Sequence, residues 1–270
     1  MTTQSERLSQ IRALHAPGRI LVLPNAWDAA SARMAQELGA EAIATSSATV
    51  AWCHGYADQE HMPTATALAT AREIIRVVTV PVSVDSEAGY SEDPAKVAQH
   101  VLALIEAGAA GINLEDGTSP PELLCTKIRA IKHAAKSSDA DIFINARCDV
   151  YLQNLVPDAR KLEESIRRGK LYADAGADGL FMPGMNDLSQ IRAVVEAIAL
   201  PVNLLIMKTV PLVSELKAAG VRRVSSGALT GRAAYGAAHH AMKMLLSDGK
   251  YDAIFATSGD CPNFNRLFGG

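Results

Sequence analysis

The stretch EAGAAGINLED, residues 106–116, joins the end of a predicted helix to a predicted strand through Gly108. Glycine suits the left-handed conformation that closes a helix, and the apolar run after it suits a strand that is buried on both faces of a parallel sheet. The same design recurs at residues 36–47 (QELGAEAIATSS), 174–184 (DAGADGLFMPG) and 218–227 (AAGVRRVSSG). The repetition predicts helix and strand units in series.

Further apolar runs at residues 20–24, 81–85, 141–146 and 201–206 bring the number of candidate strands to eight. Eight alternating strand and helix units over about 250 residues match the size of a (β/α)8 barrel of the TIM type. A doubly wound sheet is the competing architecture, but it rarely has eight strands so evenly spaced. We therefore predict that residues 1–270 form one (β/α)8 barrel domain, with a helix at residues 6–15 covering its bottom.

The chain continues well past the eighth predicted strand. Residues 233–246 are predicted to form a helix, and residues 247–270 form a tail that is too long for a simple terminus. Together, residues 233–270 make a C-terminal extension with several apolar side chains in its tail, among them Phe255 and Phe268. The extension is expected to pack either on its own barrel or, by exchange, on a neighbouring subunit.

Composition indicates a small-molecule ligand. The net charge is −3, 49% of the residues are hydrophobic and 20% are charged. We expect no nucleic-acid partner, because no basic stripe is present. No apolar run approaches the ~18 residues of a membrane span, and the first residues lack the apolar core of a signal peptide, so we expect a cytoplasmic protein without a membrane partner. The four cysteines show no CxxC spacing and are expected to be small buried residues.

Acidic residues collect where predicted strands end, which is the face that carries chemistry in such barrels. Asp85, Glu87, Glu115 and Asp116 lie at these ends, and Asp58 lies in the loop after the second strand. Crowded carboxylates repel one another unless a cation neutralises them. Mg²⁺ prefers oxygen ligands and needs only one or two protein carboxylates. Because no histidine joins the cluster at metal-ligand spacing, zinc is disfavoured.

Some of these acids are expected to cap helices instead, as Asp and Ser commonly do where a strand leads into a helix. We predict this capping role for Asp28, Asp93 and Asp116. Asp85 and Glu115 each end an apolar run at the functional face, which favours a metal site for these two residues.

Arg147 follows the apolar run IFINA and is predicted to hold an anionic substrate, because its planar fork matches a carboxylate. A salt bridge to the acidic cluster is the alternative role, and the two are compatible. Ser46 and Ser47, with their backbone N–H groups, are predicted to bind another carboxylate or carbonyl of the substrate, or else to cap the next helix.

Four segments in order resemble the isocitrate lyase and phosphoenolpyruvate mutase superfamily: LPNAWDAASARMAQELGAEAIATSSA (23–48), VSVDSEAGY (82–90), GAAGINLEDG (108–117) and INARCD (144–149). The resemblance extends over about residues 20–227. It implies an (α/β)8 barrel, a dimer or tetramer that exchanges a C-terminal helix, Mg²⁺ (with Mn²⁺ as an alternative), and a 2-oxo acid or related dicarboxylate as substrate.

Carried to this sequence, the resemblance implies that Asp85 binds the metal directly. It implies further metal contacts, direct or through water, from Asp58, Glu87 and Glu115. The implied substrate contacts are Ser46, Ser47, Ala48, Arg147 and Asn203. The catalytic candidates are Asp58, Glu115 and Arg147.

The sequence also departs from the family pattern. The lyases carry a mobile loop with a KKCGH or KRCGH motif, in which cysteine is the acid, whereas this chain runs GTSPPELLCTKI after Asp116. Isocitrate or methylisocitrate cleavage is therefore not expected. The gating loop of the mutase, with its lysine and asparagine, is also unmatched, and Glu87 stands where many relatives have aspartate.

The leading hypothesis is a Mg²⁺-dependent lyase or decarboxylase that acts on a small 2-oxo dicarboxylate such as oxaloacetate through a metal-stabilised enolate. Three alternatives stay open. The first is C–P bond chemistry, as a phosphonopyruvate hydrolase or phosphonomutase. The second is a Schiff-base aldolase that uses Lys208. The third is a non-catalytic barrel that binds a 2-oxo acid.

Overall fold

The sheet closes through its first strand, which Pro24 divides into two short pieces. In this computed structural model, which describes residues 3–269, the piece β1 pairs with β9 and the piece β2 pairs with β3, and every pairing is parallel. Proline has no N–H to donate to a sheet, so the interruption falls where the sequence dictates it. The strands are β1 (Leu21–Leu23), β2 (Asn25–Ala26), β3 (Ile43–Thr45), β4 (Val82–Asp85), β5 (Gly111–Glu115), β6 (Phe143–Arg147), β7 (Gly179–Met182), β8 (Val202–Leu205) and β9 (Arg223–Ser225).

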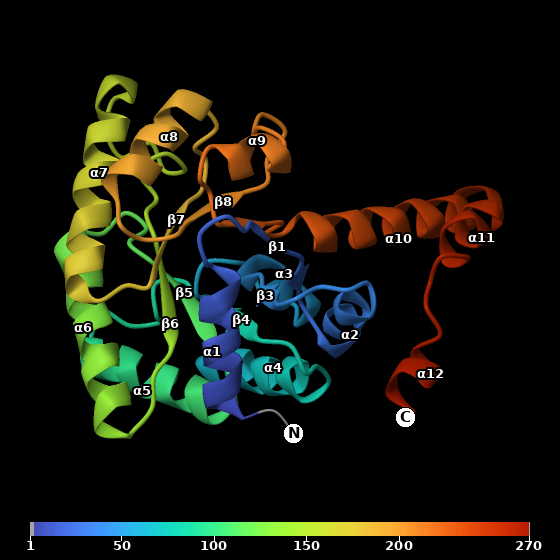
Figure 1. Ribbon diagram of the computed structural model, residues 1–270. Helices are drawn as coiled ribbons and strands as arrows, with labels where there is room; N and C mark the ends of the chain where they lie inside the picture. Colours follow the sequence, from blue (N-terminus) through green and yellow to red (C-terminus); the bar gives the residue numbers. More distant parts are fainter. Residues whose placement is uncertain (1–2, 270) are drawn as a thin grey trace.

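Helices surround this sheet on its outside (Figure 1). The helices that follow the strands are α2 (Ala29–Glu37), α3 (Ser47–Cys53), α4 (Thr64–Arg76), α5 (Pro94–Glu106), α6 (Pro121–Ser137), α7 (Asp158–Ala175), α8 (Leu188–Ala197), α9 (Val213–Ala218) and α10 (Leu229–Asp248). The glycines that were predicted to close helices have φ between 90° and 105°. The prediction of a (β/α)8 barrel is confirmed.

Helix α1 (Gln4–Leu14) covers the bottom of the barrel, as predicted. Its Leu8 and Ile11 are buried in a cluster with Ala110 and Phe143, which lie at the starts of strands. The helix begins two residues earlier than expected because Thr3 forms a capping box with Glu6.

The C-terminal extension lies largely away from the barrel. Helix α10 projects outward with α11 (Asp252–Ser258) at its far end, and an extended segment then leads away from that end to α12 (Phe264–Phe268) (Figure 1). Neither α11 nor α12 contains a buried residue. Helix α12 touches the barrel side of the molecule where Arg33 Nε donates to the carbonyl of Leu267 at 3.2 Å. No helix within residues 3–269 is both long enough and apolar enough to span a membrane.

His15 is a buried titratable group at the bottom of the barrel. Its ring stacks on Phe143, with the ring centres 4.5 Å apart, and its Nδ1 bonds to the carbonyl of Ile11 at 2.7 Å. Its Nε2 is buried without a partner. Burial, and then the charge of Arg223, lower the pKa of His15 to about 4. The neutral ring is therefore the form that the folded protein accepts.

We expect the free energy of unfolding to fall as the pH drops through 6.5 toward 4. Between these pH values His15 is protonated in the unfolded chain and neutral in the folded chain. This difference lowers the free energy of unfolding by up to about 3 kcal/mol. Urea unfolding of the wild type and of His15→Gln between pH 7.5 and 4 isolates this effect, because glutamine keeps a hydrogen-bond donor and does not titrate. Parallel pH profiles of the two proteins would contradict the assignment.

Candidate active site

A pocket of about 170 Å³ opens at the carboxyl ends of the strands. It is lined from several sides of the barrel by Asn25, Ser46, Ser47, Ala48, Asp58, Asp85, Asn113, Arg147, Leu152, Phe181, Pro183, Leu205, Ser225, Gly227 and Ala228. The structure thus brings together the predicted site residues Ser46, Ser47, Ala48, Asp58, Asp85 and Arg147. The predicted acids Glu87 and Glu115 lie beside the pocket rather than on its wall.

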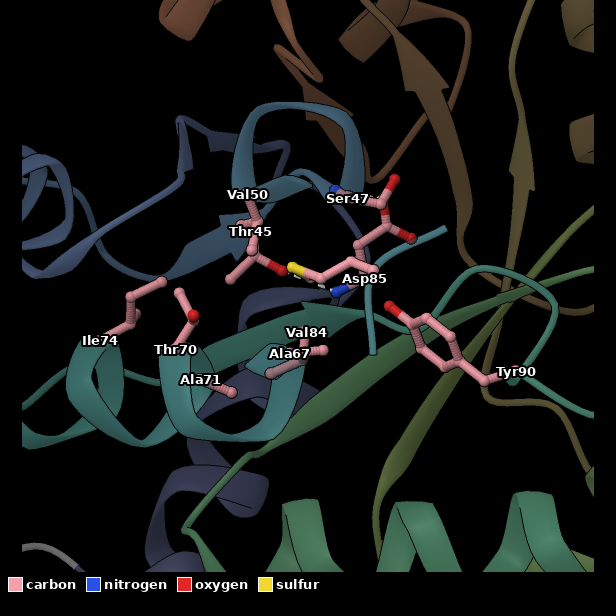
Figure 2. Close-up of a pocket in the computed structure, with 11 residues that line it drawn as sticks. Thr45, Ser47, Val50, Ala67, Thr70, Ala71, Ile74, Val84, Asp85 and Tyr90 are labelled. Atoms are coloured by element: carbon pink, nitrogen blue, oxygen red, sulfur yellow. Dashed lines mark hydrogen bonds between the residues drawn. The ribbon is translucent and has the colours of Figure 1, made fainter. Parts of the chain in front are cut away.

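One carboxylate oxygen of Asp85 accepts a hydrogen bond, and the other has no partner among the described residues. Its backbone N–H donates to Thr45 Oγ1 at 2.8 Å, and its Oδ2 accepts from the backbone N–H of Ser47 at 3.1 Å. The other carboxylate oxygen, Oδ1, is buried and has no hydrogen-bond partner. Figure 2 shows Asp85 between Ser47 and the ring of Tyr90, beside a small cavity against α4. An oriented carboxylate with one unsatisfied buried oxygen is suited to a cation.

The neighbouring acids crowd Asp85. Glu87 is buried, and its Oε2 accepts from the backbone N–H of Glu60 at 2.6 Å. Burial, and then the charge of Asp85, raise the pKa of Glu87 to about 7. Burial also raises the pKa of Glu115, an effect that Arg147 opposes and Asp85 reinforces. Asp58 has a buried Oδ1 without a partner. The site therefore holds more negative charge than its own residues neutralise.

This donor set fits Mg²⁺ better than a metal that needs a complete protein cage. Within residues 3–269, no group of three or more His, Cys, Asp or Glu side chains is arranged to hold a metal ion by itself. Mg²⁺ is commonly bound through one or two carboxylates, with water and substrate oxygens filling the other positions. The unsatisfied oxygens of Asp85 and Asp58 supply donors of that kind at one pocket.

Backbone strain concentrates in the two loops beside Asp85. Of the six non-glycine residues with positive φ in the described part of the chain, four are Gln59 (72°), Glu60 (60°), Glu87 (49°) and Tyr90 (59°). Such conformations cost energy and cluster at functional sites. The turn between Glu87 and Tyr90 also requires glycine. Gly89 has φ of 96°, and a Cβ there would lie 2.7 Å from Val97 Cγ1.

Arg147 forms the predicted salt bridge to the acidic cluster. Its Nε and Nη2 donate to the two oxygens of Asp149 at 2.7 and 3.0 Å, and its Nη1 lies 2.5 Å from Glu115 Oε2. A guanidinium has five N–H groups, so these contacts leave one on each terminal nitrogen. Because Arg147 lines the pocket, the remaining donors can hold a carboxylate of a ligand.

The serine N–H groups already have partners inside the protein. Ser46 N–H donates to the carbonyl of Ala26 at 3.3 Å, and Ser47 N–H donates to Asp85. Because both residues line the pocket and their N–H groups are used, the hydroxyls are the donors that they have left for a ligand. Asn203 is buried next to Arg223 in the strand register and does not line the pocket, while Lys208 is exposed outside it.

Asp28 and Asp93 cap helices as predicted, but the capping prediction for Asp116 is wrong. Helix α6 begins at Pro121 with Pro120 as its cap, beyond the reach of Asp116. The carboxylate of Asp116 is instead buried, with one oxygen accepting from Arg168 at 2.7 Å and from the hydroxyl of Tyr172. These two partners lie four residues apart on α7, on one face of the helix.

Two cysteine predictions are also wrong. Cys125 and Cys148 are buried as expected, but Cys53 and Cys261 are exposed. Cys53 is the last residue of the short helix α3, at the surface, and Cys261 lies in the extension that leaves the barrel.

The sequence analysis missed three polar residues that shape the pocket. Asn25 donates to the carbonyl of Thr45 at 2.7 Å and accepts from Gly227 N–H at 2.8 Å, so it ties the first and last strands together. Asp149 anchors Arg147. Asn113 lies within an apolar run. Only Asn25 and Asp149 follow a predicted strand end, which is the signal that could have found them.

Comparisons with known proteins assign this chain to a family. The family model for phosphoenolpyruvate phosphomutase matches residues 11–246. The chain belongs to that family. Its relatives fall within the isocitrate lyase and phosphoenolpyruvate mutase superfamily.

Among the relatives of this phosphomutase-family chain, the uncharacterized protein Rv1998c of Mycobacterium tuberculosis (strain ATCC 25618 / H37Rv) is 36% identical over 88% of both chains. A structure from Burkholderia cenocepacia J2315, provisionally named a phosphonomutase, is 38% identical with a TM-score of 0.83, and the match covers 92% of this chain and all of that one. Oxaloacetate acetylhydrolase bound to 3,3-difluorooxalacetate is 28% identical with a TM-score of 0.84, covering 97% and 92% of the two chains.

This family member has a short connection between β5 and α6, residues 116–120. Cys125, the cysteine nearest to the position of the lyase motif, is buried in α6, and its Sγ lies 3.6 Å from the carbonyl of Leu171. It does not line the pocket. The chain therefore presents no cysteine acid from this loop to a bound substrate.

Asp116→Ala and Asp93→Ala are expected to differ sharply in stability. Removing Asp116 leaves the largely buried guanidinium of Arg168 with one partner fewer and the Tyr172 hydroxyl unpaired, at an expected cost of about 3–5 kcal/mol. Removing the exposed cap Asp93 is expected to cost about 1 kcal/mol. Urea unfolding at neutral pH measures both losses. Similar losses for the two variants would refute the structural role of Asp116.

Proposed function

We propose that this protein is a Mg²⁺-dependent lyase or decarboxylase that acts on a small 2-oxo dicarboxylate such as oxaloacetate. The observation that carries the proposal is the unsatisfied buried oxygen of Asp85, held by Thr45 and Ser47 at a pocket that Arg147 also lines. The pocket volume of about 170 Å³ suits a small anion rather than a nucleotide or a polymer.

In decarboxylation of oxaloacetate, the bond between C3 and C4 breaks and CO2 leaves. The electron pair of that bond forms the C2–C3 double bond of an enolate, and C3 then takes a proton from water. A bound Mg²⁺ would supply positive charge beside the 2-oxo group, where negative charge develops. Asp85, with Asp58 beside it, would hold that ion. The two free N–H groups of Arg147 would hold the carboxylate next to the carbonyl and keep the substrate in one orientation.

The absence of a cysteine from the pocket lining agrees with this choice. Loss of CO2 needs no acid to protonate a departing group, unlike the cleavage catalysed by the lyases that use the cysteine loop. Oxaloacetate acetylhydrolase, a relative of similar fold, suggests hydrolysis at the C2–C3 bond as a variant, in which water attacks C2 and oxalate and acetate form.

C–P bond chemistry is the second candidate. The match to the phosphoenolpyruvate phosphomutase model and the likeness to the Burkholderia protein favour it. A phosphonopyruvate substrate shares the 2-oxo acid end with oxaloacetate and differs at the other end of the molecule. Products distinguish these candidates: CO2 or oxalate from oxaloacetate, and phosphate or phosphoenolpyruvate from phosphonopyruvate.

We expect Asp85→Asn to lower kcat/KM for the active substrate on the order of a thousandfold, because the neutral amide removes the charge that holds the metal. The measurement is a Mg²⁺ and Mn²⁺ titration of product formation over oxaloacetate, phosphonopyruvate and substituted malates. Asp93→Ala, which alters an exposed aspartate that does not line the pocket, serves as the control and should retain activity. Full metal-dependent turnover by Asp85→Asn would sink the proposal.

We further propose that the C-terminal extension docks on a second copy of the chain. The extension exposes Met242, Leu246, Tyr251, Phe255 and Phe268. An apolar groove of about 510 Å³ lies at its root between α2 and α10, and its lining includes Trp27, Met34, Leu38 and Ala233. An apolar arm and an apolar groove on the same chain can satisfy each other reciprocally in a two-fold dimer.

Light scattering at micromolar concentration is expected to find the wild type as a dimer or a larger assembly. The double variant Leu246→Asp/Phe255→Asp should be monomeric, because each change places a charge on the apolar face. Lys250→Glu alters charge at an exposed position of the same arm and should assemble as the wild type does. A monomeric wild type would overturn this part of the proposal.

A further inference from the structure

The interior of the barrel beneath the pocket is polar. Such interiors are usually filled by branched aliphatic side chains. Here Ser83 of β4, Asn113 of β5, Asn145 of β6 and Arg223 of β9 contact one another at the barrel axis, and we refer to these four residues as the polar floor. Of the four, Asn113 also lines the pocket. Through Asn113, the buried side chains of the polar floor are therefore in contact with the pocket.

Arg223 is an uncompensated cation within the polar floor. Its side chain is 0% exposed, and no carboxylate lies within salt-bridge distance among residues 3–269. Its contacts are neutral: Nη1 and Nη2 lie 3.4 Å from Ser83 Oγ, and Nη2 lies 3.3 Å from Asn113 Oδ1. Burial lowers the pKa of Arg223 to about 10, so the guanidinium stays charged at neutral pH.

The guanidinium fixes which way the Asn113 amide points. Arginine donates hydrogen bonds and accepts none, so only the amide oxygen of Asn113 can face it. Asn145 Nδ2 donates to the same oxygen at 2.9 Å. With Oδ1 held by two donors, the Nδ2 of Asn113 is left for the pocket, and within the described chain it makes no hydrogen bond.

We infer that Arg223 is a positioning residue that holds Asn113 with its N–H groups toward the pocket, where they bind a carboxylate oxygen of the substrate. The inference rests on the proposed function, since it concerns the same pocket. Arg147 and Asp85 define one side of the site, and Asn113 adds a neutral donor from below. If Arg223 only stabilised the fold, a side chain that also accepts hydrogen bonds would serve equally well beside Asn113. An arginine, which only donates, allows one orientation of the Asn113 amide.

Oxalate in the presence of MgCl2 is the probe, and its binding is measured by calorimetry. Asn113→Asp is expected to weaken binding roughly 10- to 100-fold, because a donor is replaced by a carboxylate that repels the anion. The same variant should fold with an unchanged or higher Tm, since its carboxylate pairs with Arg223. Asn186→Asp makes the same chemical change at an exposed position and should bind oxalate as the wild type does.

A double-mutant cycle separates positioning from a direct effect of charge. Arg223→Met should weaken oxalate binding several-fold in the wild-type background and have no further effect in an Asn113→Ala background. An equal loss in both backgrounds would overturn the positioning role. The inference as a whole would be overturned if Asn113→Asp bound oxalate with wild-type affinity. It would also be overturned if the wild type did not bind oxalate in the presence of MgCl2. Asn113-dependent oxalate binding without turnover of any 2-oxo acid would instead leave the inference standing and remove the proposed function.

Discussion

The repulsion among carboxylates at one end of a closed barrel governs the arrangement of the site. Parallel pairing of β4, β5 and β6 places their ends side by side, so Asp85, Glu115 and Arg147 share one largely buried space. Each carboxylate is balanced differently: Asp85 by the backbone N–H of Ser47, Glu87 by the backbone N–H of Glu60, and Glu115 by the guanidinium of Arg147. These contacts satisfy only part of the negative charge, and the unsatisfied oxygens of Asp85 and Asp58 remain for a ligand.

Three largely buried arginines of the barrel differ in where they lie and in how their charge is neutralised. Arg147 lies at the pocket, where two of its donors remain available, and Asp149 fixes its orientation. Arg168 lies outside the barrel, neutralised by Asp116 and Glu164. Arg223 lies beneath the pocket, and no carboxylate of residues 3–269 lies within salt-bridge distance of it. A buried charge without a partner is costly. Its retention in the interior agrees with the proposed role of holding the Asn113 amide in one orientation.

The fold could be predicted because its signals are local: a glycine that closes a helix and an apolar run that follows it need no knowledge of the rest of the chain. The site could be predicted only where side chains follow strand ends. Asp93 and Asp116 look alike in sequence, yet one caps a helix and the other meets Arg168, some fifty residues away. Asn113 and Arg223 lie within apolar strands, and only barrel closure reveals which side of the strand they occupy.

Barrels of this fold usually change specificity through the loops that follow the strands. In this chain the connection after β5 is short and carries no acid cysteine to the pocket, so loop closure at that point contributes little chemistry. Besides loop residues such as Asp58, a ligand meets groups built into the strands, among them Asp85, Asn113 and Arg147. Strand positions are more rigid than loops, because each is held by two neighbouring strands. A site of this kind should accept a narrow range of shapes, since its donors cannot move to follow a larger ligand.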